Sequence, residues 1–270
     1  MLGIPCDIIG IEAVATAHQA LLIEDLAHSA GAKYSDEREV GTVGDIAMLS
    51  FGRDKAIDTV NGGALIVRRP ELIVQMRPAT HQPSFVMQMR DRLYPLLAWH
   101  VRALSRIKLG LPLLAVASKL KLTTRSADGD VDVAMSLPGW QAKRALQELS
   151  TMDQRTTQRR DKRTLYVDAL GRYMPEAALS DSTAAIRVPL LINNRTAVLA
   201  ALKDQQFFVQ DTWYDVPVSP VRFYHKAHYI KENCPVAVEV AERIVNLPTH
   251  QYVTPEQVAR MARIITEEAG

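Results

Sequence analysis

Residues 21–25 (LLIED) and 44–51 (GDIAMLSF) decide the fold class. Each stretch contains an uninterrupted apolar run that is too short for a helix and typical of a strand buried on both faces of a parallel sheet. A third run, ALIV at residues 64–67, follows Gly62 and Gly63. Three such strands close together in the chain predict the centre of an α/β sheet with mostly parallel strands. Because the chain opens with one helix and then enters an interior strand, we expect the neighbouring strands to come from residues outside this sequence.

The rest of the chain predicts a helical region and a second, smaller α/β domain. A short helix is expected at residues 11–20. Residues 85–166 lack strand signals and show helical spacing, most clearly at Ala142, Ala145, Leu146, Leu149 and Met152. Further along, we expect strands at 186–192 and 207–209 and helices at 196–204, 236–245 and 255–268. The predicted parts are a remnant of a large domain at 1–85, a helical linker at 86–165 and a small C-terminal α/β domain at 166–270.

The composition is that of an ordinary globular protein whose partners are small molecules or proteins. Among 270 residues, 32 Lys and Arg nearly balance 30 Asp and Glu, so no strong field draws the chain to nucleic acid. Cys6 and Cys234 follow no metal or disulfide spacing, which fits a reducing, cytoplasmic setting. The N-terminus does not resemble a secretory leader, and no stretch resembles a membrane span.

The histidines do not predict a metal site, because their spacing matches no ligand pattern. They stand scattered at His81, His100, His225, His228 and His250. His225 and His228 are neighbours of Arg222, Tyr224 and Tyr229, so they either line a substrate pocket or belong to a surface loop.

Four residues that could do chemistry follow the first two predicted strands, namely Asp25, His28, Ser50 and Lys55. Ligands of open α/β sheets bind at the carboxyl ends of the strands, so these groups are expected to converge. A lysine can hold pyridoxal 5′-phosphate (PLP) covalently if a desolvated pocket lowers its pKa, and a carboxylate keeps the cofactor's pyridine nitrogen protonated. Taken singly, the residues could be a surface lysine, a helix-capping aspartate and a turn serine. Their combination favours a PLP site.

The order of these motifs resembles the core of the DegT/StrS-type sugar aminotransferases, which are PLP enzymes of fold type I. The matching stretches are 22–32 (LIEDLAHSAGA), 41–45 (GTVGD), 50–55 (SFGRDK) and Gly62-Gly63, with further similarity at 137–149, 234–237 and 246–250. The resemblance covers nearly the whole chain. It implies that about the first third of the family's length is absent. The absent part includes the glycine-rich loop that cradles the phosphate and the aromatic residue that stacks on the cofactor.

The resemblance also implies roles for the four residues. Lys55 would bind PLP covalently and act as general acid and base, Asp25 would pair with the pyridinium nitrogen, and Ser50 would donate to the phosphate. His28 would lie within reach of the cofactor ring. Some relatives carry histidine in place of the lysine and catalyse dehydrations, so Lys55 favours amino transfer.

The activity implied by the resemblance is transfer of an amino group, from glutamate, to a nucleotide-linked keto-sugar in surface polysaccharide or sugar-metabolite biosynthesis. A homodimer is implied as well, because the sites of the family form between subunits. Two alternatives stay open. One is a truncated, non-catalytic paralogue with a dimerisation or regulatory role, and the other is a different PLP reaction such as dehydration.

The sequence departs from the family at two places. The usual Gly-Glu-Gly-Gly turn reads Val60-Asn61-Gly62-Gly63, and the Asn-Tyr-Arg segment that reaches a partner subunit reads Asp132-Val133-Ala134. Contacts to substrate and phosphate at a dimer interface are therefore not predicted from these positions.

A basic, apolar segment is a second distinctive feature. From Arg92 to Ala127 there is no acidic residue, and among Leu, Ala, Trp99 and Val101 the cations are Arg92, Arg102, Arg106, Lys108, Lys119, Lys121 and Arg125. Helical spacing places Arg102 and Arg106 on one face and Leu97, Val101 and Leu104 on another. The segment is interpreted either as a contact with a membrane surface or a lipid-linked sugar, or, more ordinarily, as a basic helix packed against the small domain or a dimer mate.

Overall fold

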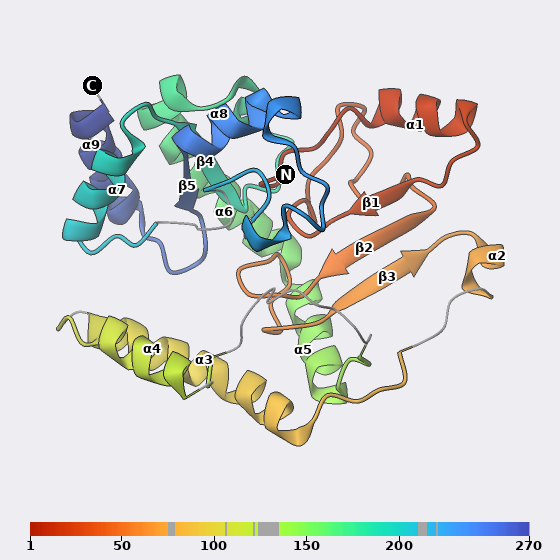
Figure 1. The fold of residues 1–270 in the computed structure, drawn as a ribbon, viewed down its shortest axis with the longest axis horizontal. Coiled ribbons are helices and arrows are strands. Elements are labelled where there is room, and N and C mark those ends of the chain that lie inside the picture. Colours follow the sequence, from red (N-terminus) through yellow and green to blue (C-terminus); the bar gives the residue numbers. More distant parts are fainter. Residues whose placement is uncertain are drawn as a thin grey trace. The chain divides into compact units, whose positions relative to one another are not determined.

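The structure is a computed structural model, and it describes residues 1–74, 79–105, 107–120, 122–123, 135–209, 215–219 and 221–269. The chain forms two compact units (Figure 1). Unit 1 consists of Met1–Cys6, Gly31–Glu37 and Gln154–Gly270, and unit 2 of Asp7–Ala30 and Arg38–Asp153. The domain boundaries predicted near residues 85 and 165 stay a prediction.

Unit 2 contains the predicted strands as a three-stranded sheet in the order β1-β2-β3. The strands are β1 (Ile23–Asp25), β2 (Ile46–Ser50) and β3 (Gly63–Val67). β1 and β2 are parallel, whereas β3 runs antiparallel to β2. All three strands were expected from their apolar runs, although the sheet is only partly parallel. The parallel pair brings the carboxyl ends of β1 and β2 to one edge.

The prediction that these strands are buried on both faces is wrong for the described part of the chain. Ile23, Met48 and Leu65 lie on one face of the sheet and are exposed, although Ile46, the partner of Ile23 on that face, is buried. On the other face Ala47 is fully buried in a cluster with Leu26, Ala30 and Ala56. A continuous apolar run cannot distinguish one covered face from two, because burial depends on which layers pack against the strand.

The described residues of unit 2 contain five helices. They are α1 (Ile8–Ala17), α2 (Pro70–Ile73), α3 (Phe85–Ser105), α4 (Gly110–Lys119) and α5 (Gly139–Ser150). α1 begins earlier than expected because the Asp7 side chain accepts a hydrogen bond from the backbone N–H of Gly10 and caps the helix. α3 and α4 lie side by side (Figure 1). None of the described helices is long and apolar enough to cross a membrane.

Unit 1 has its own core around a two-stranded antiparallel sheet of β4 (Arg187–Leu191) and β5 (Ile244–Pro248). Its helices are α6 (Met152–Leu170), most of which belongs to this unit, α7 (Arg195–Asp204), α8 (Pro235–Arg243) and α9 (Pro255–Ala269). Short 3-10 turns lie at Gly171–Tyr173, Glu176–Leu179, Val221–Phe223 and Lys231–Asn233. The core is formed by fully buried side chains from these elements, among them Tyr166, Leu190, Leu202, Leu247, Met261 and Ile265.

Unit 1 corrects two sequence-based predictions. Residues 207–209 form no strand, and the strand that pairs with β4 is β5, which was expected to belong to a helix and the turn after it. β5 follows α8 directly, without glycine between them, so local pattern gave no sign of the change from helix to strand. Its pairing with β4 is a long-range contact and decides its conformation.

Candidate functional site

Asp25 and Ser50 lie on the same face at the same edge of the sheet in unit 2. Asp25 ends β1 and is in register with Met48 of β2, and Ser50 ends β2 two positions beyond Met48. Paired residues of neighbouring strands share a face, and so do residues two apart in a strand. The parallel register therefore brings together two of the residues that the sequence singled out.

Lys55 lies in the loop from β2 to β3 and next to Ser50. The hydroxyl of Ser50 accepts a hydrogen bond from the backbone N–H of Gly52 at 3.4 Å, and the backbone N–H of Lys55 donates to the carbonyl of Gly52 at 3.3 Å. A Cβ placed on Gly52 would be 3.5 Å from Ser50 Oγ and 3.9 Å from Lys55 Cγ. Both side chains thus flank Gly52, and both are half-buried.

The Asp25 side chain is exposed, and it also stabilises the turn that follows β1. Its Oδ1 accepts a hydrogen bond from the backbone N–H of Ala27 at 2.8 Å, and its carbonyl accepts one from Ser29 Oγ at 3.3 Å. This is the turn geometry that aspartate favours after a strand. Oδ2 can still meet a ligand because the side chain is exposed, whereas His28, in the same turn, is half-buried.

Contacts from α5 fix the loop that carries Lys55. The carbonyl of Asp58 accepts a hydrogen bond from Arg144 Nε at 3.0 Å, and Gln141 Nε2 donates to the carbonyls of Thr59 at 3.1 Å and Asn61 at 3.2 Å. Burial raises the pKa of the Asp58 carboxyl, while the N–H groups of Val60 and Asp54 that bond it act in the opposite direction. These residues were not singled out from the sequence, and the similarity over 137–149 was the one available signal for them.

The turn that departs from the family keeps a glycine-like backbone. Val60 has φ +75°, in the left-handed region that β-branched residues rarely adopt, and Gly62 has φ +108°. A Cβ on Gly63 would lie 2.6 Å from the carbonyl oxygen of Leu49, so this glycine is required by the close approach of β2. Val60 thus adopts a backbone conformation that glycine reaches without strain. The other departure, Asp132-Val133-Ala134, lies outside the described residues.

Glu24 is a buried carboxylate that organises the connection into β2, and it was missed from the sequence. Its two oxygens accept hydrogen bonds from the backbone N–H groups of Gly41 at 2.7 Å, Val43 at 2.9 Å and Gly44 at 2.6 Å. Arg68 lies 3.9 Å away and also donates to the carbonyl of Gly44 at 2.7 Å. A carboxylate surrounded by donors can be buried without losing its charge.

We expect Glu24→Ala to lower the free energy of unfolding by about 3 kcal/mol, because three backbone N–H groups lose their acceptor in a buried place. Urea unfolding followed by circular dichroism measures this change. Glu37→Ala is the control, since the Glu37 side chain is exposed and forms a surface pair with Lys33 at 3.3 Å. A Glu24→Ala variant as stable as the Glu37→Ala control would contradict the role of this carboxylate.

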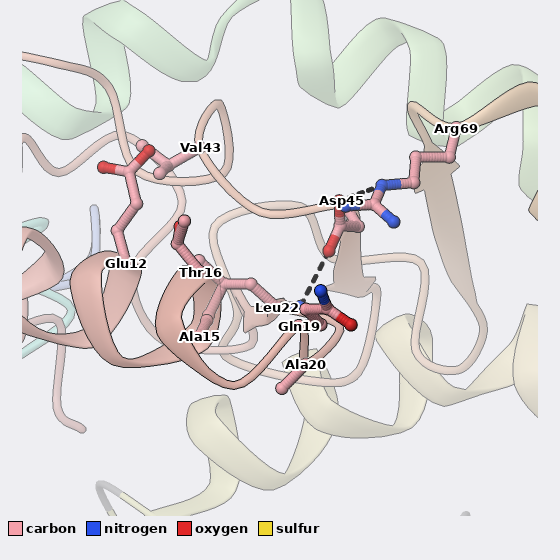
Figure 2. Close-up of a pocket in the computed structure, with 9 residues that line it drawn as sticks. All are labelled: Glu12, Ala15, Thr16, Gln19, Ala20, Leu22, Val43, Asp45 and Arg69. Carbon is pink, nitrogen blue, oxygen red and sulfur yellow. Dashed lines mark hydrogen bonds and ion pairs between the residues drawn. The ribbon is translucent and has the colours of Figure 1, made fainter.

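A polar pocket lies at the opposite edge of the sheet (Figure 2). It is lined by Glu12, Ala15, Thr16, Gln19, Ala20, Leu22, Val43, Asp45 and Arg69. Asp45 binds Arg69 Nε at 2.5 Å and accepts a hydrogen bond from the backbone N–H of Leu22 at 2.8 Å. These bonds join the residues just before β1 and β2 to the second residue after β3, so Asp45 and Arg69 help to hold the strands together. The site predicted from the sequence is at the other edge.

The described residues offer no cluster of metal-binding side chains. No group of three or more His, Cys, Asp or Glu residues suited to a metal is found there. Cys6 and Cys234 are free thiols. His225 and His228 are exposed, which agrees with the surface-loop interpretation.

The comparison with protein families gives one match along almost the entire chain. The model of the DegT/DnrJ/EryC1/StrS aminotransferase family matches residues 1–266. UDP-N-acetyl-3-dehydro-alpha-D-glucosamine 3-aminotransferase of Acidithiobacillus ferrooxidans is 26% identical over 272 residues, which cover 98% of this chain and 62% of that protein. GDP-perosamine synthase of Caulobacter vibrioides is 38% identical over 77 residues, 28% of this chain and 20% of that protein. The chain therefore spans less than two thirds of the length of these relatives.

Solved structures give the same result for the fold. A DegT DnrJ EryC1 StrS aminotransferase from Brucella abortus has a TM-score of 0.65 at 19% identity, covering 100% of this chain and 63% of that one. DesV from S. venezuelae has a TM-score of 0.69 at 20% identity, with the same coverage of 100% and 63%. The α/β fold of this chain thus aligns with part of the fold of sugar aminotransferases.

Proposed function

The chain belongs to the DegT/DnrJ/EryC1/StrS aminotransferase family, and on this premise we propose that it catalyses PLP-dependent transfer of an amino group to a keto-sugar. The observation that carries the proposal is the register of β1 and β2. It places Asp25 and Ser50 on one face at the carboxyl edge of the sheet, and Lys55 follows Ser50 in the adjoining loop. Ligands of open α/β sheets bind at this edge.

The residues present match the chemical groups of PLP. The exposed carboxylate of Asp25 would accept a hydrogen bond from the protonated pyridine nitrogen, and the Ser50 hydroxyl would donate to the phosphate. The amine of Lys55 would bind the aldehyde carbon covalently and, once released, hold and move the proton at the carbon that bears the amino group. When bound, PLP supplies an electron sink for this proton transfer.

The substrate proposal comes from the relatives. One of them is named for 3-amination of UDP-N-acetyl-3-dehydro-glucosamine and another as a GDP-perosamine synthase. We propose for this chain a nucleotide-linked keto-sugar as acceptor, glutamate as donor, and a homodimer as the working state. The product would enter surface polysaccharide or sugar-metabolite biosynthesis.

The test is to incubate the purified chain with PLP, reduce it with borohydride, digest it and locate the modified peptide by mass spectrometry. A pyridoxyl group on the Lys55 peptide, together with conversion of bound PLP to its amine form by glutamate, is the expected result. No adduct at saturating PLP would support the non-catalytic alternative. An adduct without conversion by glutamate would point to another PLP reaction.

A further inference from the structure

The helix pair α3 and α4 exposes apolar side chains where surface helices normally expose polar ones. On α3 these are Phe85, Val86, Leu93, Leu96 and Trp99, and their exposed fractions range from 53% for Leu93 to 76% for Phe85. The spacing of Val86, Leu93, Leu96 and Trp99 puts them along one side of the helix. Apolar side chains that are exposed together on one side of a helix, and not scattered singly, are typical of a binding surface.

Apolar side chains are also exposed on α4 and on the connection that precedes it. Leu111 and Val116 of α4 are exposed, as are Ile107 and Leu109 before it and Leu120 after it. The exposed apolar residues of α3, α4 and this connection are called the hairpin surface. Both helices therefore present several apolar side chains to solvent, so the exposure is a property of the whole pair and not of one residue.

The pair is held firmly within unit 2. Gly110 is buried where α4 begins, and a Cβ at this position would collide with Ser105 Oγ and the carbonyl of Val101 on α3. Near the start of α3, Asp91 Oδ2 accepts a hydrogen bond from Asn61 Nδ2 at 3.1 Å, and Tyr94 Oη accepts one from Arg53 at 2.5 Å. The hairpin surface is thus a fixed feature of the unit.

The charges on this pair have one sign at the surface. Arg92, Arg102, Lys108 and Lys119 are exposed. The acidic residue of α3, Asp91, is buried at 6% exposure by its contact with the Lys55 loop, and no acidic residue follows in the sequence until after Ala127. The hairpin surface therefore combines apolar groups with positive charge. The cations Arg106, Lys121 and Arg125 lie outside the described residues.

We propose that the hairpin surface docks on a membrane that contains anionic phospholipids, with α3 and α4 lying in the interface and not crossing it. The apolar side chains and the Trp99 ring would enter the headgroup boundary, and the long cationic side chains would reach the phosphates. A second copy of the chain fits this surface less well. A symmetric contact through it would place cations against cations, because no acidic side chain is exposed on the described residues of α3, α4 and their connection.

Vesicle flotation with the full chain tests this proposal. Vesicles of phosphatidylcholine alone are compared with vesicles that also contain phosphatidylglycerol, at low and high salt. We expect binding to the anionic vesicles that weakens as salt rises, because the attraction to headgroups is screened.

The decisive variant combines Leu96→Glu with Trp99→Glu. It should lower the partition onto anionic vesicles by at least roughly tenfold, because two apolar side chains that would enter the membrane are replaced by carboxylates that the anionic lipid repels. Both side chains are largely exposed, so the far-ultraviolet circular dichroism spectrum should not change. The matched control combines Val14→Glu on α1 with Leu146→Glu on α5, which introduces the same two charges at similarly exposed apolar positions away from the hairpin surface.

The proposal is overturned if the unaltered chain does not float with anionic vesicles at low salt, or if the Leu96→Glu, Trp99→Glu variant floats as well as the control with two glutamates elsewhere. Light scattering after gel filtration separates the competing occupant. If the unaltered chain does not bind vesicles but forms a dimer, and the Leu96→Glu, Trp99→Glu variant is a monomer, a second copy of the chain covers the surface. None of these outcomes depends on aminotransferase activity, so the two proposals fail independently.

Discussion

We expect Lys55→Ala to remove the covalent attachment of PLP and to slow conversion of bound PLP by glutamate roughly 10³-fold or more. The amine at this position is the group proposed both to bind the aldehyde carbon and to move the proton, and general acid–base groups alone contribute about 10² to 10⁴. Mass spectrometry after borohydride reduction measures the attachment. Single-turnover spectroscopy with glutamate measures the rate.

Two further variants separate chemistry from charge and folding. Lys55→Arg keeps the positive charge of the half-buried loop but cannot form the covalent bond, so it should fail as completely as alanine. Lys143→Ala removes an exposed lysine of α5 in the same unit and should leave both measurements unchanged. An adduct that persists in Lys55→Ala would transfer the role to another lysine and disprove the assignment.

Asp25→Asn should lower the rate of the glutamate half-reaction by about 10² to 10³, because a neutral amide no longer stabilises positive charge on the pyridine nitrogen. This variant separates the charge of Asp25 from its hydrogen bond in the turn. Its amide oxygen can still accept the hydrogen bond from the backbone N–H of Ala27, so the turn after β1 keeps its structural contact. Covalent attachment at Lys55 should therefore survive while the rate falls.

Asp168→Asn, on the exposed side of α6, is the matched control for this change of charge. Comparing the unfolding midpoints of the two variants checks that the difference lies in chemistry and not in stability. If Asp25→Asn reacted with glutamate at the unaltered rate, the proposed role at the pyridine nitrogen would be disproved. Asp25 would then serve only to stabilise the turn through its hydrogen bond with Ala27.

The strands at the centre of unit 2 were predictable because their side chains carry the information locally. Short apolar runs and the glycines before β3 indicate strands whatever their surroundings. β5 was not predictable in this way. Its residues Ile244–Pro248 follow α8 without a break, and only their pairing with β4 makes them a strand.

The residues proposed for the site were also named from the sequence, but their geometry was not. Asp25, Ser50 and Lys55 are recognisable by type and position after strands. That Asp25 and Ser50 share a face follows from the register with Met48, which no local pattern encodes. The contacts from Gln141 and Arg144 that hold the Lys55 loop come from a helix about eighty residues further along the chain, beyond the reach of local pattern.

The amino-acid sequence by itself determined the three strands of unit 2, which residue types stand at the carboxyl ends of β1 and β2, and that residues 92–127 carry cations without acids. Only the tertiary structure decided that Glu24 is buried among three backbone donors, that Ile23 is exposed, and that the apolar side of α3 faces solvent. The physical reason is that propensity and periodicity act between neighbours in the chain. Burial, register and hydrogen-bond partners depend on segments distant in sequence that meet when the chain folds.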